Sequence, residues 1–254
     1  MKRRYTYKPD LGDKRDFYFE PKLVGIPELV DMRHNMPAIE DQGNLGSCTA
    51  NAGVALAEYL DFRNDRHYMH RSRLFVYYNE RVLEGTVNID SGAYIRDAIK
   101  ALVKWGACTE TLWPYVISRY KQKPSTACYK AAALKQAIKY MRVNQTQDDM
   151  CNALVQGYPI EFGFTVYESF ESDAVASTGM VPMPDVYNEY VLGGHACVIV
   201  GYDLNKRLWI CRNSWGKKWG DKGYFYMPFD YLLDGDLSED FWIIEEFENI
   251  KLTA

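Results

Sequence analysis

The spacing of hydrophobic and polar positions changes near the middle of the chain. In the first half, apolar residues recur every three or four positions, which predicts helices. These helices are expected at residues 48–63, 72–83, 91–105, 125–140 and 146–156. In the second half, β-branched and aromatic runs are separated by Gly, Asp and Asn, which predicts strands. The strands are expected at residues 159–166, 195–203, 207–213, 223–227 and 241–245.

Helices followed by antiparallel strands indicate an α+β protein in two lobes. Pro and Gly interrupt every long periodicity in residues 1–27, so this N-terminal extension is expected to be an extended strap. A mainly helical lobe is then predicted for residues 28–140, and a mainly β lobe for residues 141–254.

Composition excludes several classes of function. The net charge of -4 argues against a nucleic-acid partner, because phosphate binding needs a basic surface. The sequence contains no apolar run long enough to span a membrane, so no membrane partner is expected. The six cysteines and four histidines do not show the spacing of a zinc site, and we expect neither a metal nor a cofactor.

Cys48 is the first candidate for chemistry. It follows a glycine-broken loop and opens the first predicted helix, with Ser47 as the expected N-cap. The start of a helix offers unpaired N–H donors and the positive end of the helix dipole, and both favour a thiolate over a thiol. The sequence therefore predicts a nucleophile at this position, provided that a base lies near it.

His195 is the histidine best placed to be that base. It follows two glycines and opens an apolar strand, whereas the other three histidines lie in polar segments. If the strands at 195–203 and 207–213 form a hairpin, Asn213 returns close to His195 and its carbonyl oxygen can accept the imidazole N–H. Trp215 is then expected to shield this hydrogen bond from water.

Three motifs in this order resemble the papain-like cysteine peptidases, over roughly residues 28–230. The motifs are Asp41-Gln42-Gly43…Gly46-Ser47-Cys48, Gly194-His195-Ala196, and Asn213-Ser214-Trp215-Gly216 with Trp219-Gly220 and Gly223-Tyr224. The resemblance implies a papain-like two-lobed fold, with a helical lobe, an antiparallel β-barrel-like lobe, and the active site in the cleft between them. It also implies a cysteine endopeptidase that acts on peptide or protein substrates.

The resemblance also assigns roles to residues. It implies that Cys48 is the nucleophile, that His195 is the base and Asn213 its orienting partner, and that the Gln42 side chain completes the oxyanion hole with the Cys48 backbone N–H. Gly92 and Trp215 are the expected substrate-binding residues, Gly92 because residues 90–93 resemble the glycine pair that binds substrate backbone in the family.

The chain departs from the family in ways that bear on its compartment and its control. Leu45 stands where a disulfide cysteine is usual, and Thr49 where a tryptophan is usual. These changes suggest a disulfide-poor branch that folds in the cytoplasm or another reducing compartment. Only 27 residues precede the segment that resembles a mature start, in place of the usual long pro-region. One hypothesis is that this extension restrains the cleft; the alternative is a strap packed on the surface.

Two other functions fit the same residues. Acyltransferases and amidases share the Cys–His chemistry, and transfer to an added amine would distinguish them from a peptidase. A non-catalytic binding module on the same fold is a further alternative, although such a module has no physical need for Gln42, Cys48, His195 and Asn213 together.

Overall fold

The computed structural model describes residues 3–22 and 25–249. Residues 1–2 and 23–24 of the predicted N-terminal extension, and residues 250–254 of the predicted β lobe, lie outside the described residues. The helices are α1 (Cys48–Asp65), α2 (Arg73–Glu84), α3 (Ile95–Lys104), α4 (Thr126–Ala132), α5 (Gln147–Val155), α6 (Asp173–Thr178) and α7 (Phe229–Leu233). The strands are β1 (Leu29–Asp31), β2 (Lys135–Arg142), β3 (Ile160–Tyr167), β4 (Val191–Asp203), β5 (Leu208–Arg212), β6 (Tyr224–Pro228) and β7 (Ser238–Asn249).

Local sequence signals set the bounds of α2 as expected. The Ser72 hydroxyl accepts a hydrogen bond from the Phe75 N–H at 3.1 Å, and Gly85 ends the helix in the left-handed conformation. The expectation for α1 was partly wrong, because Ser47 precedes the helix but its hydroxyl does not cap it. That hydroxyl instead bonds the Tyr115 hydroxyl at 2.6 Å, so tertiary contacts hold the start of α1.

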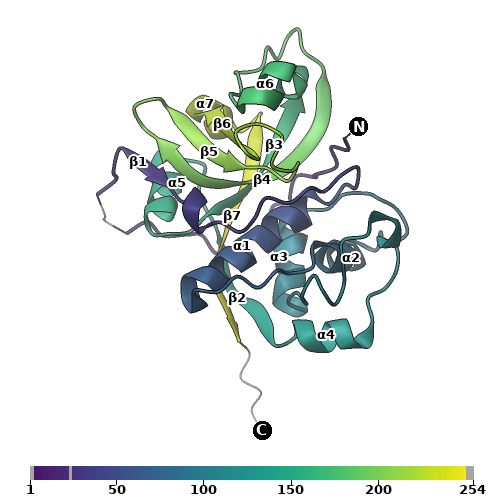
Figure 1. The fold of residues 1–254 in the computed structure, drawn as a ribbon. Coiled ribbons are helices and arrows are strands. Elements are labelled where there is room, and N and C mark those ends of the chain that lie inside the picture. Colours follow the sequence, from purple (N-terminus) through teal and green to yellow (C-terminus); the bar gives the residue numbers. More distant parts are fainter. Residues whose placement is uncertain (1–2, 23–24, 250–254) are drawn as a thin grey trace.

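The strands form one antiparallel sheet with the order β2-β7-β3-β4-β5-β6, and β1 pairs with β4. The sheet is not closed into a barrel, which corrects the barrel-like lobe expected from the resemblance. The architecture is α+β, with helices α1 to α4 on one side of the molecule and the sheet on the other (Figure 1). None of the helices in residues 3–22 and 25–249 has the length and apolar character that crossing a bilayer requires.

The single helix expected at residues 125–140 was wrong. The helix α4 ends at Ala132, and the strand β2 begins at Lys135 and pairs with β7. Alanine and lysine favour a helix locally, but hydrogen bonding along β7 overrides that preference. The division of the chain at residue 140 stays a prediction, and it falls inside β2.

Helix α1 lies in the middle of the molecule, between the sheet and helices α2 and α3 (Figure 1). All its residues from 48 to 61 are buried, including the charged Glu58 and Asp61. Small side chains let the sheet approach the helix closely: the Glu161 carboxylate on β3 lies 3.3 Å from where a side chain at Gly53 would begin. This packing fixes the position of Cys48 at the start of α1.

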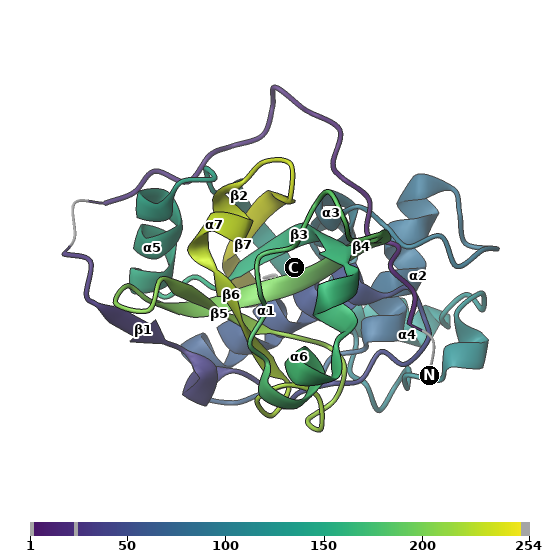
Figure 2. The ribbon, with the colours of Figure 1, turned by 90° about the horizontal axis from the view of Figure 1, so that it is seen from above.

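The N-terminal extension crosses both parts of the molecule. It forms parallel bridges from Thr6 to Gly194 and from Lys8 to Tyr94, loops outward, and forms a bridge from Tyr18 to Arg142 before it reaches β1 (Figure 2). We call residues 3–22 the strap. Ion pairs anchor its middle part to the body of the protein, and they join Asp16 to Arg96 at 2.5 Å and Asp10 to Arg142 at 3.1 Å.

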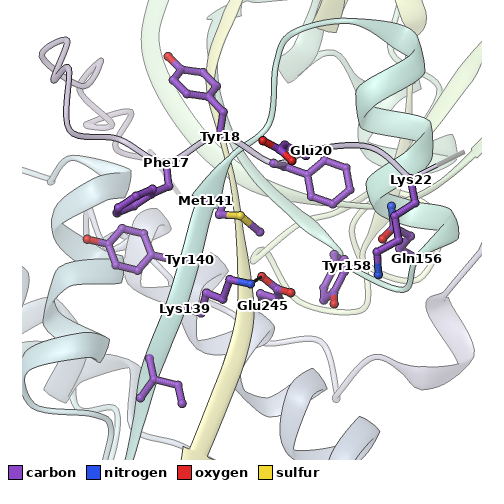
Figure 3. A pocket seen from close by; sticks show the side chains of 12 residues that line it. Phe17, Tyr18, Glu20, Lys22, Lys139, Tyr140, Met141, Gln156, Tyr158 and Glu245 are labelled. Carbon is purple, nitrogen blue, oxygen red and sulfur yellow. Dashed lines mark ion pairs between the residues drawn. The ribbon is translucent and has the colours of Figure 1, made fainter.

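The outer part of the strap borders a groove of about 580 Å³ beside the edge strand β2. Phe17 of the strap lies beside Tyr140 of β2 at this groove, and Lys139 and Glu245, which also line it, form an ion pair (Figure 3). The groove contains none of the predicted site residues, so it is separate from the candidate active site.

Candidate active site

The hairpin of β4 and β5 brings His195 and Asn213 together. The two strands pair antiparallel, with Val198 opposite Arg212, and Asn213 directly follows β5. The His195 Nε2 atom lies 2.9 Å from the Asn213 Oδ1 atom, and both side chains are buried. A hydrogen bond between two buried groups holds the imidazole ring in one orientation.

The surroundings of Asn213 determine the tautomer of His195. The Asn213 Oδ1 atom also accepts the Ser214 backbone N–H at 2.8 Å and the Cys197 S–H at 3.6 Å. The Ser214 backbone N–H can only donate, so the Asn213 side-chain atom that it contacts must be the oxygen and not the nitrogen. The same oxygen atom faces His195. The His195 Nε2 atom therefore carries the proton. Its Nδ1 atom has no hydrogen-bond partner among the described residues, and its lone pair is available to act as a base.

Trp215 covers the imidazole ring. The two rings stack with centroids 4.8 Å apart and an angle of 22° between their planes. The tryptophan is itself buried, and the guanidinium of Arg3, from the strap, lies 3.8 Å from its ring centroid. The stacking keeps water away from the bond between His195 and Asn213, as the sequence suggested.

Cys48 is completely buried at the start of α1 and faces β4. It belongs to an apolar cluster with the strap residue Tyr7 and with Ala196, the residue after His195; the cluster also includes Ile95, Ile99 and Trp242. Cys48 and His195 thus belong to different halves of the chain, and Cys48 packs against the residue that follows His195 on β4.

Burial shifts the pKa of both groups toward the neutral state. It raises the pKa of the Cys48 thiol to about 12, although the backbone N–H groups of Ala196 and Thr49 oppose the rise. It lowers the pKa of His195 to about 4, although the hydrogen bond that the His195 ring donates to Asn213 opposes the fall. The expected thiolate at a helix start is therefore not the form in this covered state, because loss of water outweighs the helix dipole. The strap supplies part of that burial.

Hydrogen bonds to Ser214 and Leu45 fix the position of Gln42. Its backbone N–H donates to the Ser214 carbonyl at 2.9 Å, its Nε2 donates to the Leu45 carbonyl at 2.9 Å, and its Oε1 accepts the Ser214 hydroxyl at 2.6 Å. An amide nitrogen carries two hydrogens, so one Gln42 N–H remains after the bond to Leu45. This donor is the one that the resemblance assigns to the oxyanion hole.

Two carboxylic acids lie beneath the start of α1. Glu80 accepts a hydrogen bond from the Thr49 hydroxyl at 2.9 Å, and Glu161 lies against Gly53. Complete burial raises the pKa of both acids well above the usual range.

The strap lies against Gly92, one of the residues that the sequence predicts to bind substrate. The Thr6 carbonyl contacts Gly92, and Tyr7 and Lys8 donate backbone hydrogen bonds to the Gly194 carbonyl at 3.0 Å and the Ala93 carbonyl at 3.3 Å. Gly92 has φ of +65°, and any side chain there would overlap Thr6. The predicted substrate-binding residue Gly92 is thus in contact with the chain's own backbone.

Two strap tyrosines complete the cover. The Tyr5 ring meets the His195 and Trp215 rings edge-on, at centroid distances of 6.2 and 6.1 Å. Tyr7 enters a buried pocket against Gly163, beside Cys48, and its hydroxyl donates to the Asp240 carboxylate at 2.6 Å. Sequence reasoning missed both tyrosines. Their only signal was aromatic residues in a segment that lacks periodicity.

The covered state makes a prediction for the reactivity of Cys48. We expect the rate constant for alkylation by iodoacetamide to be low at neutral pH and still rising between about pH 8 and pH 10, because the thiolate is the reactive form. The raised pKa means that the covered state holds the thiol proton, so covering is favoured at neutral pH and is lost as the pH approaches 12. Mass spectrometry of alkylated Cys48 would measure this, and a plateau at neutral pH would contradict it.

A buried thiol, an imidazole with an oriented partner and a fixed amide donor are the groups that a cysteine hydrolase site requires. The model of the family described as "Papain family cysteine protease" matches residues 26–231. The chain belongs to the papain family of cysteine proteases, and it is a cysteine peptidase.

Individual relatives agree with this assignment. An uncharacterized peptidase C1-like protein of Acanthamoeba polyphaga mimivirus is 45% identical, over 97% of this chain and 88% of the relative. The crystal structure of xylellain, a cysteine protease from Xylella fastidiosa, matches with a TM-score of 0.89 and 39% identity, over 99% of each chain. Procathepsin L 3 of Tenebrio molitor, at 17% identity over 88% of this chain and 72% of that one, shares the fold with a TM-score of 0.71.

Proposed function

We propose that this peptidase cleaves peptide bonds with Cys48 as nucleophile and His195 as general base, and that the strap restrains it. Asn213 orients His195, and Gln42 stabilises the oxyanion together with the Cys48 backbone N–H. The observation that carries the proposal is the pairing of His195 with Asn213, which leaves the His195 Nδ1 atom without a partner among the described residues, while Cys48 packs against Ala196.

The chemistry follows from these positions. The Cys48 thiol transfers its proton to the His195 Nδ1 atom as the sulfur attacks the substrate carbonyl carbon. The negative oxygen that forms accepts the Gln42 and Cys48 N–H groups. When the tetrahedral intermediate collapses, His195 donates that proton to the leaving amine. In the second half of the cycle His195 takes a proton from water as the water oxygen adds to the acyl carbon. The bond between that carbon and the Cys48 sulfur then breaks, the carboxylic acid product leaves, and His195 returns the proton to the sulfur.

The strap supports restraint because it contacts both sides of the cleft. Its backbone is bonded to the loop before α3 and to β4, and its Tyr5 and Tyr7 side chains cover His195 and Cys48. Substrate binding then requires that residues 5–8 leave. Restraint is thus a competition between the strap and the substrate for the same groups.

A double substitution within the full chain tests this. We expect Tyr5→Ala/Tyr7→Ala to raise both Cys48 alkylation and peptide kcat/KM at neutral pH by about a hundredfold. The basis is that removing the buried Tyr7 side chain costs about 3–5 kcal/mol, and since every 1.4 kcal/mol is about tenfold, the lower end of this range corresponds to about a hundredfold. Alkylation quenched at timed intervals measures the reactivity of Cys48, and hydrolysis of a fluorogenic peptide library measures kcat/KM.

Tyr18→Ala is the matched control, because Tyr18 is a strap tyrosine that lies at the distant groove of Figure 3. It should leave both rates unchanged. Equal rates in the parent and the double variant would refute restraint and leave the catalytic roles untouched.

For the compartment, we propose a reducing one such as the cytoplasm. The support is that all six cysteines are free and buried, which is how cysteine behaves as a small hydrophobic residue. Measuring the redox state of the thiols in protein isolated under acid quench would test this.

A further inference from the structure

Ser214 touches both halves of the proposed catalytic machinery through different atoms. Its backbone N–H donates to the Asn213 Oδ1 atom at 2.8 Å, whereas its hydroxyl donates to the Gln42 Oε1 atom at 2.6 Å. The residue is buried, and Gln42 lies 172 positions earlier in the chain. The side chain of Ser214 is therefore bonded to Gln42 and not to the histidine pair.

The orientation of the Gln42 amide depends on this hydroxyl. The amide stabilises an oxyanion only when its nitrogen, and not its oxygen, faces the substrate. At one end the Leu45 carbonyl requires a donor, which fixes the nitrogen there. At the other end the Ser214 hydroxyl satisfies the oxygen, which would otherwise be a buried acceptor without a partner. Without the hydroxyl, the amide loses the contact that holds its oxygen away from the cleft.

We propose that Ser214 is a positioning residue of this peptidase: its hydroxyl holds the Gln42 amide so that the remaining N–H faces the oxygen of the bound carbonyl. The inference rests on the proposed role of Gln42. The two bonds of Ser214 can be separated experimentally, because Ser214→Ala removes the hydroxyl and keeps the backbone N–H that orients Asn213.

A double-mutant cycle tests the coupling. Ser214→Ala, Gln42→Ala and the combined variant are made in the full chain that carries Tyr5→Ala/Tyr7→Ala, so that the cleft is uncovered. We expect Ser214→Ala to lower kcat about tenfold with little change in KM, a fraction of the loss from removing an oxyanion donor. In the Gln42→Ala background the same change should lower kcat by less than about twofold, because the two residues act through one group.

A second readout separates positioning from general damage. Alkylation of Cys48 by iodoacetamide creates no oxyanion, so its pH profile should be the same with and without the Ser214 hydroxyl. Ser214→Thr, which keeps a hydroxyl, should recover most of the lost kcat. Ser238→Ala removes another buried serine hydroxyl, one that donates to the Tyr231 carbonyl at 3.0 Å, and should change neither readout.

The outcomes are distinguishable. Three results would each overturn the role of Ser214. The first is an equal loss of kcat from Ser214→Ala in both backgrounds, and the second is a shifted pH profile of alkylation in Ser214→Ala. The third is an unchanged kcat in Ser214→Ala when Gln42→Ala greatly lowers kcat. If Gln42→Ala itself keeps full kcat, the assignment of the oxyanion hole fails, and the inference about Ser214 falls with it.

Discussion

Replacing Cys48 with alanine should abolish peptide hydrolysis, with kcat reduced by about 10⁶-fold, the scale seen when a catalytic nucleophile is removed from an enzyme of this logic. The reason is that, without the Cys48 sulfur, no nucleophile is present to attack the substrate carbonyl and accept the acyl group. The side chain is small, buried and without a charged partner, so the fold should persist. Steady-state hydrolysis by the uncovered Tyr5→Ala/Tyr7→Ala chain, with and without Cys48, measures the effect.

Cys151→Ala is the matched control, because Cys151 is a buried free thiol of α5 that is absent from the candidate site. Its activity should equal that of the parent, and circular dichroism should show that both variants are folded. Full activity in purified Cys48→Ala would refute the assignment of the nucleophile.

The second large effect is expected from Gln42→Ala. Loss of one oxyanion donor typically lowers kcat about a hundred- to a thousandfold, or about 2.7–4 kcal/mol. Because the donor acts in the transition state, kcat should fall while KM changes little. Steady-state and single-turnover hydrolysis by the Tyr5→Ala/Tyr7→Ala chain, with and without Gln42→Ala, would separate kcat from KM.

The rate of Cys48 alkylation should be preserved in Gln42→Ala, since that reaction needs only the thiolate. A fall in alkylation that matches the fall in kcat would instead mean that Gln42 supports the position of Cys48. The bond between the Gln42 Nε2 atom and the Leu45 carbonyl, which lies in the loop before α1, is the contact to suspect in that case.

Much of the fold could be predicted where local signals and tertiary contacts agree. The helix α2 has its serine cap, its glycine end and its apolar spacing in one short stretch, and its bounds are close to those expected. The strand β2 shows the opposite case. Its partner β7 lies about a hundred residues later, and the sequence of residues 135–142 contains no local signal that predicts this pairing.

The site divides in the same way. The order of the three motifs indicated Cys48, His195, Asn213 and Gln42, and the hairpin expected between β4 and β5 explains why Asn213 meets His195. The bond from Ser214 to Gln42 joins two loops that become neighbours only after folding. The strap contacts had no pattern at all, because an extended segment takes its conformation from the surface on which it lies.

The six buried thiols can serve as probes of local and global unfolding, because each becomes reactive only when the region around it opens. They are spread over α1, α4, α5, β4 and β5 and the loop at Cys108, so each reports on a different region. Thiol protection should divide into a local class, with Cys48 exposed by departure of the strap, and a global class exposed only by unfolding. Peptide mapping after timed labelling would then give the free energy of each opening event in one unmodified chain.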